Sequence, residues 1–196
     1  MAGWTARTKL MALCVMAIVS PQGCTGFGAG DAARGSYMTF AIIKPDAVSK
    51  GSTAAIQNKI AAAGFSISSQ RMGVIEEQLV RTLYSEHQLK PFFGELVAFM
   101  TSNPSVVMIL TKPSGGAVET WRRLIGPTDP GAARAQQPMS LRALFGTDVT
   151  RNGLHGSETP AAALRELSIF HDYLKKPKRP RGRGLPGGSA AGASPL

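Results

Sequence analysis

The segment Arg151-Asn-Gly-Leu-His-Gly-Ser157 places one histidine, His155, between two glycines, Gly153 and Gly156. Small neighbours let a charged ligand approach the imidazole closely. The residues after Ser157 begin a helix-like run, and helix N-termini bind anions through free backbone N–H groups and the helix dipole. The segment therefore predicts an anion site, with phosphate as the natural ligand. A lone histidine is, however, more often a surface residue or a packed one.

The composition predicts one folded domain with extensions at both ends. The chain has 196 residues, is 43% hydrophobic and carries a net charge of +10. Residues 36–174 contain 13 Lys/Arg and 11 Asp/Glu, whereas residues 175–183 contain six cations and no acid. The basic charge thus belongs to the ends, and the central part is nearly neutral. The two cysteines, Cys14 and Cys24, precede the predicted domain, which excludes a disulfide scaffold and a cysteine metal site in the core.

The two ends are predicted to be disordered extensions. Residues 1–37 contain Arg7 and Lys9 before an apolar run at 10–19, which is shorter than the roughly 20 residues that span a bilayer. A secretory signal, a mitochondrial presequence and a misassigned start before Met38 all fit this leader. Residues 175–196 form a basic tail rich in Pro and Gly, which is either solvated, a nuclear-localisation-like run, or a contact for nucleic acid or an acidic partner.

Hydrophobic periodicity predicts strands and helices that alternate, with helices also occurring in pairs. Strands are expected at 38–43, 65–72 and 106–110, and helices at about 52–63, 76–87, 91–101, 118–125 and 160–169. Ser52 is expected to cap the first helix and Gly64 to end it. Residues 126–140, which carry three prolines, are expected to form a long loop. This order favours an α+β domain, with one antiparallel or mixed sheet covered by helices, over a doubly wound fold.

Neither of the common phosphate-binding glycine loops occurs in the chain. The remaining side chains suited to phosphate are scattered cations, whose guanidinium or ammonium groups pair with phosphate oxygens. They are Lys44 at a predicted strand end, Arg122, Arg123, Arg142 and Arg151. Each of them, taken alone, is better explained as a solvated charge.

Five blocks, taken in order, carry a resemblance to a known family. They are Thr39-Phe-Ala-Ile-Ile-Lys-Pro-Asp-Ala-Val48, Pro91-Phe-Phe93, Gly126-Pro-Thr-Asp-Pro130, Arg142-Ala-Leu-Phe145 and Arg151–Ser157. The chain resembles the nucleoside diphosphate kinases over about residues 38–170, and most closely their divergent type-6 branch, which predicts a kinase domain at 38–174. The resemblance implies a ferredoxin-like α/β sandwich, in which a four-stranded antiparallel sheet is covered by helices.

The resemblance also implies a ping-pong transfer of the γ-phosphate of a nucleoside triphosphate to a nucleoside diphosphate through a phosphohistidine at His155. The residues that would hold phosphates or border the transferred group are Lys44, Tyr84, Arg122, Thr128 and Arg142. Asn152 would contact the ribose, Phe92 would stack on the base beside Leu96, and Ser157 and Glu166 would orient the histidine. Mg²⁺ would arrive on the nucleotide rather than in a protein cage.

Two departures from the family pattern leave an alternative function open. The stretch from Thr128 to Arg142 is about three residues longer than in common members, and the basic tail replaces the usual C-terminal extension. The alternative is a low-activity nucleotide-binding regulatory or scaffold protein that keeps the kinase fold. The resemblance further implies a homo-oligomer and a mitochondrial location, with cytoplasmic, nuclear and secretory locations as alternatives.

Overall fold

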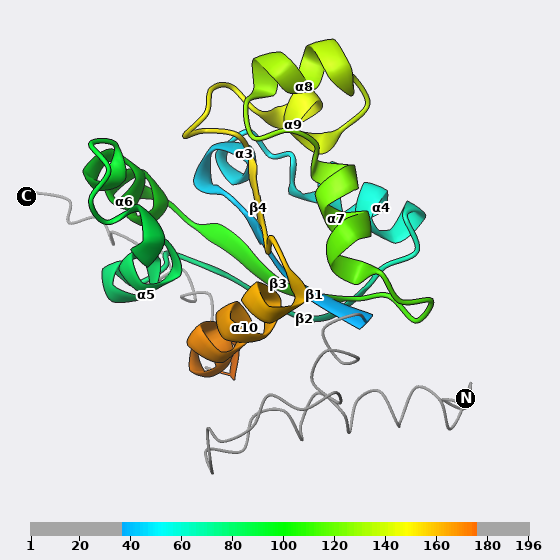
Figure 1. Ribbon diagram of the computed structural model, residues 1–196, viewed down its shortest axis with the longest axis horizontal. Helices are drawn as coiled ribbons and strands as arrows, with labels where there is room; N and C mark the ends of the chain where they lie inside the picture. Colours follow the sequence, from blue (N-terminus) through cyan, green and yellow to red (C-terminus); the bar gives the residue numbers. More distant parts are fainter. Residues whose placement is uncertain (1–36, 176–196) are drawn as a thin grey trace, which may run out of the picture.

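The structure is a computed structural model that describes residues 37–175 (Figure 1). The predicted leader and basic tail, with the location and partner expected from them, lie outside these described residues apart from one residue at each boundary. The described part holds one four-stranded sheet in the order β2-β3-β1-β4, and every neighbouring pair is antiparallel. The strands are β1 (Met38–Ile43), β2 (Ser66–Gly73), β3 (Ser105–Thr111) and β4 (Leu154–Gly156). Within residues 37–175, no helix has the length and apolar character needed to cross a membrane.

The side chains of β1 alternate between two hydrophobic cores, as expected for a strand covered on both faces. Phe40 and Ile42 pack in the core formed with α5 (Glu77–Leu83), α6 (Phe93–Ser102) and α10 (Pro160–Lys175). Ala41 and Ile43 pack in the other core, with α4 (Thr53–Ala62) and α7 (Ala117–Ile125). Figure 1 shows the two groups of helices on opposite sides of the sheet. The predicted α+β sandwich is confirmed.

Several predicted elements have different ends in the structure. The helix expected at 76–87 is divided into α5 and a 3-10 turn, η1 (Ser85–His87), so that Tyr84 lies at the junction. The last helix, expected to end at 169, continues to Lys175 because Phe170 and Tyr173 extend its buried face. Helix α4 begins where predicted, but its backbone starts without a capping hydrogen bond from the Ser52 side chain within the described residues.

The prediction of a long loop at 126–140 is wrong, because α8 (Pro130–Gln136) occupies the centre of this stretch. Asp129 caps this helix by accepting a hydrogen bond from the Gly131 backbone N–H at 2.9 Å, and Pro130 supplies the favoured first residue. Two further short helices were not predicted: α9 (Leu141–Phe145) and α3 (Pro45–Ser49). The Asp-Pro pair is a helix-start signal that the three prolines of this stretch obscured.

His155 lies on a strand and not directly before a helix, which corrects the local structure expected for it. It pairs with Ile42 of β1 on the edge strand β4, while α10 begins five residues later at Pro160. Gly153 turns the chain into β4 with a φ of +81°, a conformation that glycine adopts without strain. The Gly153 carbonyl also accepts the backbone N–H of Lys44 at 2.8 Å, which ties the turn to the end of β1.

Candidate active site around His155

The imidazole of His155 is held from the side of α10. Its Nε2 lies 3.1 Å from Oε2 of Glu166, and the same oxygen accepts the Ser157 hydroxyl at 2.7 Å. Glu166 and Ser157 are both buried, and the edge of Phe40 packs against the imidazole with ring centres 5.9 Å apart. The two residues expected to orient His155 are therefore both in contact with this network.

The hydrogen bonds determine which imidazole nitrogen is free. A carboxylate only accepts, so Nε2 of neutral His155 carries the proton and Nδ1 keeps its lone pair. Nδ1 lies 3.4 Å from the hydroxyl of Tyr84, whose pKa is raised by burial and by the charge of Glu166. Tyr84 therefore remains a hydrogen-bond donor, and Nδ1 is the nitrogen available to a ligand.

Lys44 is a buried cation at the end of β1. Its Nζ donates to the Thr150 carbonyl at 3.2 Å, and only 5% of the residue is exposed. Burial, followed by the charge of Arg142, lowers the pKa of Lys44 to about 7, against the opposing effects of Asp46 and Asp148. From its position at a strand end, Lys44 would be expected at the surface, but the structure buries its side chain.

Arg142 of α9 is the second buried cation, and its guanidinium donates hydrogen bonds to two separate backbone segments. Nη1 donates to the Gly126 carbonyl at 2.8 Å and Nη2 to the Leu154 carbonyl at 3.1 Å. Burial, followed by the charge of Arg122, lowers the pKa of Arg142 to about 10. Its charge lowers the pKa of both Lys44 and Tyr84, so these three groups lie within electrostatic range of one another.

Asn152 is buried below the turn that leads into β4. Its amide nitrogen donates to the carbonyls of Val149, at 2.9 Å, and Thr128, at 3.1 Å. Its amide oxygen is buried, with no hydrogen-bond partner among the described residues. The same turn is ordered by Asp148, which accepts the backbone N–H groups of Thr150 and Arg151. Asn152 thus joins the turn to the stretch before α8.

The other predicted contacts lie around the exposed rim. Phe92 is 46% exposed at the start of α6, whereas Leu96 on the next turn is buried. The ring of His87 lies 5.6 Å from that of Phe92 and 6.3 Å from that of Tyr84. Arg122 on α7 and Thr128 are exposed, and Arg122 forms a loose ion pair with Glu158 at 3.8 Å.

Sequence reasoning missed one structural partner of the site, Trp121, whereas Arg151 has the structural role expected of it. The indole Nε1 of Trp121 donates to the His155 carbonyl at 3.3 Å. The helical spacing of Trp121 and Ile125 indicates that both are buried, but it does not indicate this hydrogen bond. Arg151, expected to be a surface or structural charge, lies over the Phe99 ring and pairs with Glu95 and Asp148. It thereby links α6 to the turn before β4.

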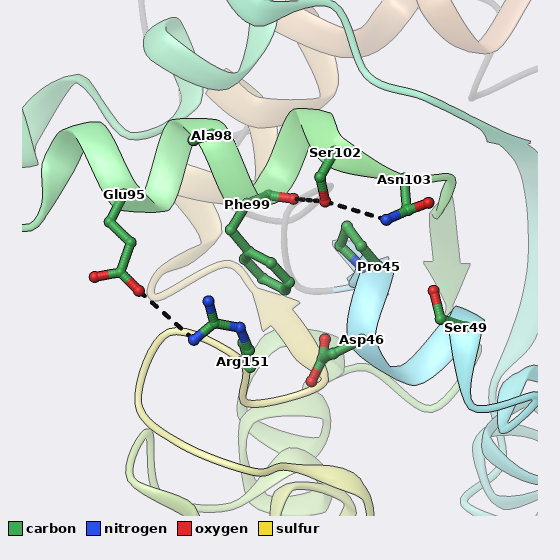
Figure 2. Close-up of a pocket in the computed structure, with 9 residues that line it drawn as sticks. All are labelled: Pro45, Asp46, Ser49, Glu95, Ala98, Phe99, Ser102, Asn103 and Arg151. Carbon is green, nitrogen blue, oxygen red and sulfur yellow. Dashed lines mark hydrogen bonds and ion pairs between the residues drawn. The ribbon is translucent and has the colours of Figure 1, made fainter.

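A hollow of about 360 Å³ lies beside the site, between α3, α6 and the Arg151 turn. Figure 2 shows Arg151 between Glu95 and Asp46, with the Phe99 ring above it in this view. Both carboxyl oxygens of Asp46 are buried here, and burial raises the pKa of this carboxyl although the charge of Lys44 lowers it. The hollow includes neither His155 nor Phe92 in its lining, so it adjoins the imidazole site without being part of it.

The geometry equips His155 for nucleophilic chemistry on an anion. A neutral imidazole is oriented by a carboxylate, and its lone pair faces a buried tyrosine. Two buried cations contact the backbone that leads to it, Lys44 at Gly153 and Thr150 and Arg142 at Leu154. Within residues 37–175 there is no group of three or more His, Cys, Asp or Glu side chains that would hold a metal ion. The cations and the imidazole suit a phosphoryl group.

Comparison with known proteins identifies the family of the chain. The family model of "Nucleoside diphosphate kinase" matches residues 37–175. The chain is 41% identical over 134 residues to a nucleoside diphosphate kinase of Bdellovibrio bacteriovorus, covering 68% of this chain and 92% of that protein. The solved nucleoside diphosphate kinase of Aquifex aeolicus is 37% identical, with a TM-score of 0.65 over 68% of this chain and 94% of that one.

Some relatives are much longer. The rat nucleoside diphosphate kinase homolog 7 is 42% identical over 132 residues, which cover 67% of this chain and 32% of that protein. The chain therefore spans about a third of that relative's length. It spans a smaller share of the length of two thioredoxin domain-containing relatives. A full-length bacterial match and a family match over the whole described fold leave one conclusion: the chain belongs to the nucleoside diphosphate kinase family.

Proposed function

We propose that the protein transfers the γ-phosphate of a nucleoside triphosphate to a nucleoside diphosphate by a ping-pong mechanism through phosphohistidine at His155. The observation that carries the proposal is the orientation of the imidazole. Glu166 binds Nε2, so the lone pair of Nδ1 is directed toward the Tyr84 hydroxyl, and the buried cations Lys44 and Arg142 contact the backbone just before His155.

In the first half-reaction, the Nδ1 lone pair attacks the γ-phosphorus, and the bond from phosphorus to the bridging oxygen breaks. The nucleoside diphosphate leaves with that electron pair, and a second nucleoside diphosphate reverses the step. The protein's part is positioning and charge neutralisation, for which Lys44, Arg142 and the exposed Arg122 and Thr128 are suited. Mg²⁺ on the nucleotide phosphates would neutralise further charge.

The rest of the nucleotide is assigned to the rim. The half-exposed face of Phe92 would stack on the base, next to Leu96, and stacking accepts every base because each has a π-face. The buried oxygen of Asn152 has no partner among residues 37–175 and would accept a hydrogen bond from a ribose hydroxyl. Broad use of nucleoside di- and triphosphates follows from this arrangement.

The direct test is incubation of the protein with γ-labelled ATP and Mg²⁺, in the absence of an acceptor. We expect label on the chain that is labile in acid and stable in alkali, and that maps to the peptide containing His155. Addition of unlabelled GDP should then move the label to GTP. A chain that binds ATP but takes up no label would overturn the kinase proposal.

Such a result would favour the second candidate function, a nucleotide-binding protein with little transfer activity. The observation in its favour is that both terminal nitrogens of Arg142 already donate to backbone carbonyls, at Gly126 and Leu154. A guanidinium engaged in this way has fewer donors left for a phosphate. We also propose, from the family resemblance alone, that the chain self-associates and acts in mitochondria.

Glu166→Gln is expected to slow phosphorylation of His155 about a hundredfold, because an amide can donate to Nε2 and favour the tautomer with the proton on Nδ1. The measurement is the rate of single-turnover labelling at saturating ATP. Glu77→Gln is the matched control, since Glu77 is exposed on α5 and paired with Arg81 away from the site. Labelling of the Glu166 variant at the wild-type rate would contradict the assigned role.

Phe92→Ala is expected to raise the KM for nucleotides about tenfold, because base stacking contributes roughly 1–3 kcal/mol. The loss should be similar for purine and pyrimidine substrates, and the free energy of unfolding should change little because Phe92 is 46% exposed. Leu89→Ala removes another exposed apolar side chain three residues earlier and should leave the KM unchanged. An unchanged KM in the Phe92 variant would show that Phe92 does not stack on the base.

A further inference from the structure

The indole of Trp121 lies directly behind the backbone of the proposed nucleophile. Trp121 is fully buried on α7, and its Nε1 donates to the His155 carbonyl at 3.3 Å. The next residue, Gly156, has no side chain, and a Cβ built there would collide with the indole. The indole therefore occupies the space in which any other residue at position 156 would place its side chain.

This contact matters because β4 is short and forms an edge of the sheet. It pairs with β1 through only three residues, Leu154 to Gly156. Side chains bind two of its carbonyl groups: Arg142 donates to that of Leu154 and Trp121 to that of His155. The position of β4 thus depends on α9 and α7 as well as on β1.

His155 is anchored from both faces of the sheet. On the α10 side, Glu166 holds the imidazole through Nε2. On the opposite side, Trp121 belongs to the core formed with α4 and α7, where Phe65 packs edge-on against the indole with ring centres 6.3 Å apart. One anchor fixes the ring and the other fixes the backbone, so the direction of Nδ1 requires both.

We propose that Trp121 is a positioning residue, whose indole N–H fixes the His155 backbone so that Nδ1 is directed at the phosphate. It lies next to Arg122, so α7 holds the nucleophile with one residue and would bind the phosphate with the next. The inference rests on the proposed phosphohistidine function. Because small displacements of a reacting group cost large factors in rate, loss of this one hydrogen bond should lower the rate of the chemical step.

The first experiment compares Trp121→Phe with Phe65→Leu, which loosens packing on the same indole but keeps its N–H. Single-turnover labelling of His155 by ATP and Mg²⁺ should be slowed about tenfold by Trp121→Phe at saturating ATP, with the half-saturating concentration unchanged within about twofold. Phe65→Leu should label at nearly the wild-type rate once corrected for the folded fraction. Equal slowing in the two variants would overturn the proposal.

The second experiment needs no nucleotide and separates this inference from the kinase proposal. Diethyl pyrocarbonate modifies each histidine, and mass spectrometry follows the peptides of His87, His155 and His171 separately. Trp121→Phe should raise the modification rate of His155 severalfold and leave the other two unchanged. If the wild type forms no phosphohistidine but this difference is found, the kinase proposal fails and the positioning role stands. An unchanged rate at His155 would overturn the positioning role.

If Trp121→Phe does not fold, the indole N–H can be removed without changing the ring shape. Biosynthetic replacement of tryptophan by benzothienylalanine, in a Trp4→Phe background, alters position 121 alone. The same slower labelling and faster modification of His155 are expected. Wild-type values in both measurements would show that the hydrogen bond has no positioning role.

Discussion

Replacing His155 by alanine is expected to lower phosphoryl exchange between nucleotides by at least about four orders of magnitude, because the variant has no nucleophile to carry the phosphate. In the wild type, Nδ1 is the free nitrogen of an imidazole whose Nε2 is bound to Glu166. Neither Tyr84 nor Ser157 replaces it, since the hydroxyl of Ser157 donates to Glu166 and burial raises the pKa of Tyr84. Coupled-enzyme assays with ATP and a second nucleoside diphosphate measure this loss.

The variant should still fold and bind nucleotides, since Lys44, Arg142 and Phe92 remain in place. His171→Ala is the matched control, because His171 lies on α10 beside Asp172, away from the imidazole site. That control should retain full exchange. Residual exchange in His155→Ala above about one part in a thousand of the wild-type rate would assign the phosphate to a different residue.

The architecture was accessible from the sequence where hydrophobic periodicity was strong. Runs such as 38–43 and 106–110 predict buried strands, and both are confirmed as β1 and β3. The three-residue strand β4 has too few residues to show a period, so its pairing with β1 follows only from tertiary contacts. Helix α8 was missed because prolines suggested a loop, although Asp129 and Pro130 form a helix start.

Most of the proposed site residues lie in the motif blocks, but the blocks do not give the geometry of the site. Lys44 and Glu166 are more than a hundred residues apart in the sequence. Nothing local indicates that Lys44 contacts the turn before His155 and that Glu166 binds its imidazole. The packing of α9 and α7 against β4 produces two such contacts. Both terminal nitrogens of Arg142 bind backbone carbonyls, and Trp121 supports the His155 backbone. Long-range contacts of this kind leave no periodic signal in a single sequence.

Lys44→Met is expected to stabilise the fold while it lowers phosphoryl transfer about a thousandfold. Burial lowers the pKa of Lys44 from 10.5 to about 7, so keeping this cation in the folded state is costly at low pH. At about 1.4 kcal/mol per pKa unit, the charge opposes folding by up to about 5 kcal/mol below pH 7. Asp46 loses its neighbouring cation in the variant, so we expect a net gain of about 2 kcal/mol in the free energy of unfolding.

The pH dependence gives the sharper test. Between pH 7 and 10.5 the folded protein binds fewer protons at Lys44 than the unfolded chain does, so this group makes wild-type stability rise with pH across that window. The stability gap between Lys44→Met and the wild type should therefore be widest below pH 7 and should close toward pH 10. Urea unfolding at several pH values measures the gap.

Lys50→Met is the matched control, since Lys50 is exposed at the end of α3 and its Nζ donates to Thr147. It should change the free energy of unfolding by less than about 0.5 kcal/mol at any pH. Nucleotide affinity of the wild type should fall as the pH rises above 7, because a phosphate favours protonated Lys44. The affinity of Lys44→Met should not show this fall. A Lys44 variant less stable than the wild type at pH 6 would mean that the buried ammonium supports the fold, and that its role is structural before it is catalytic.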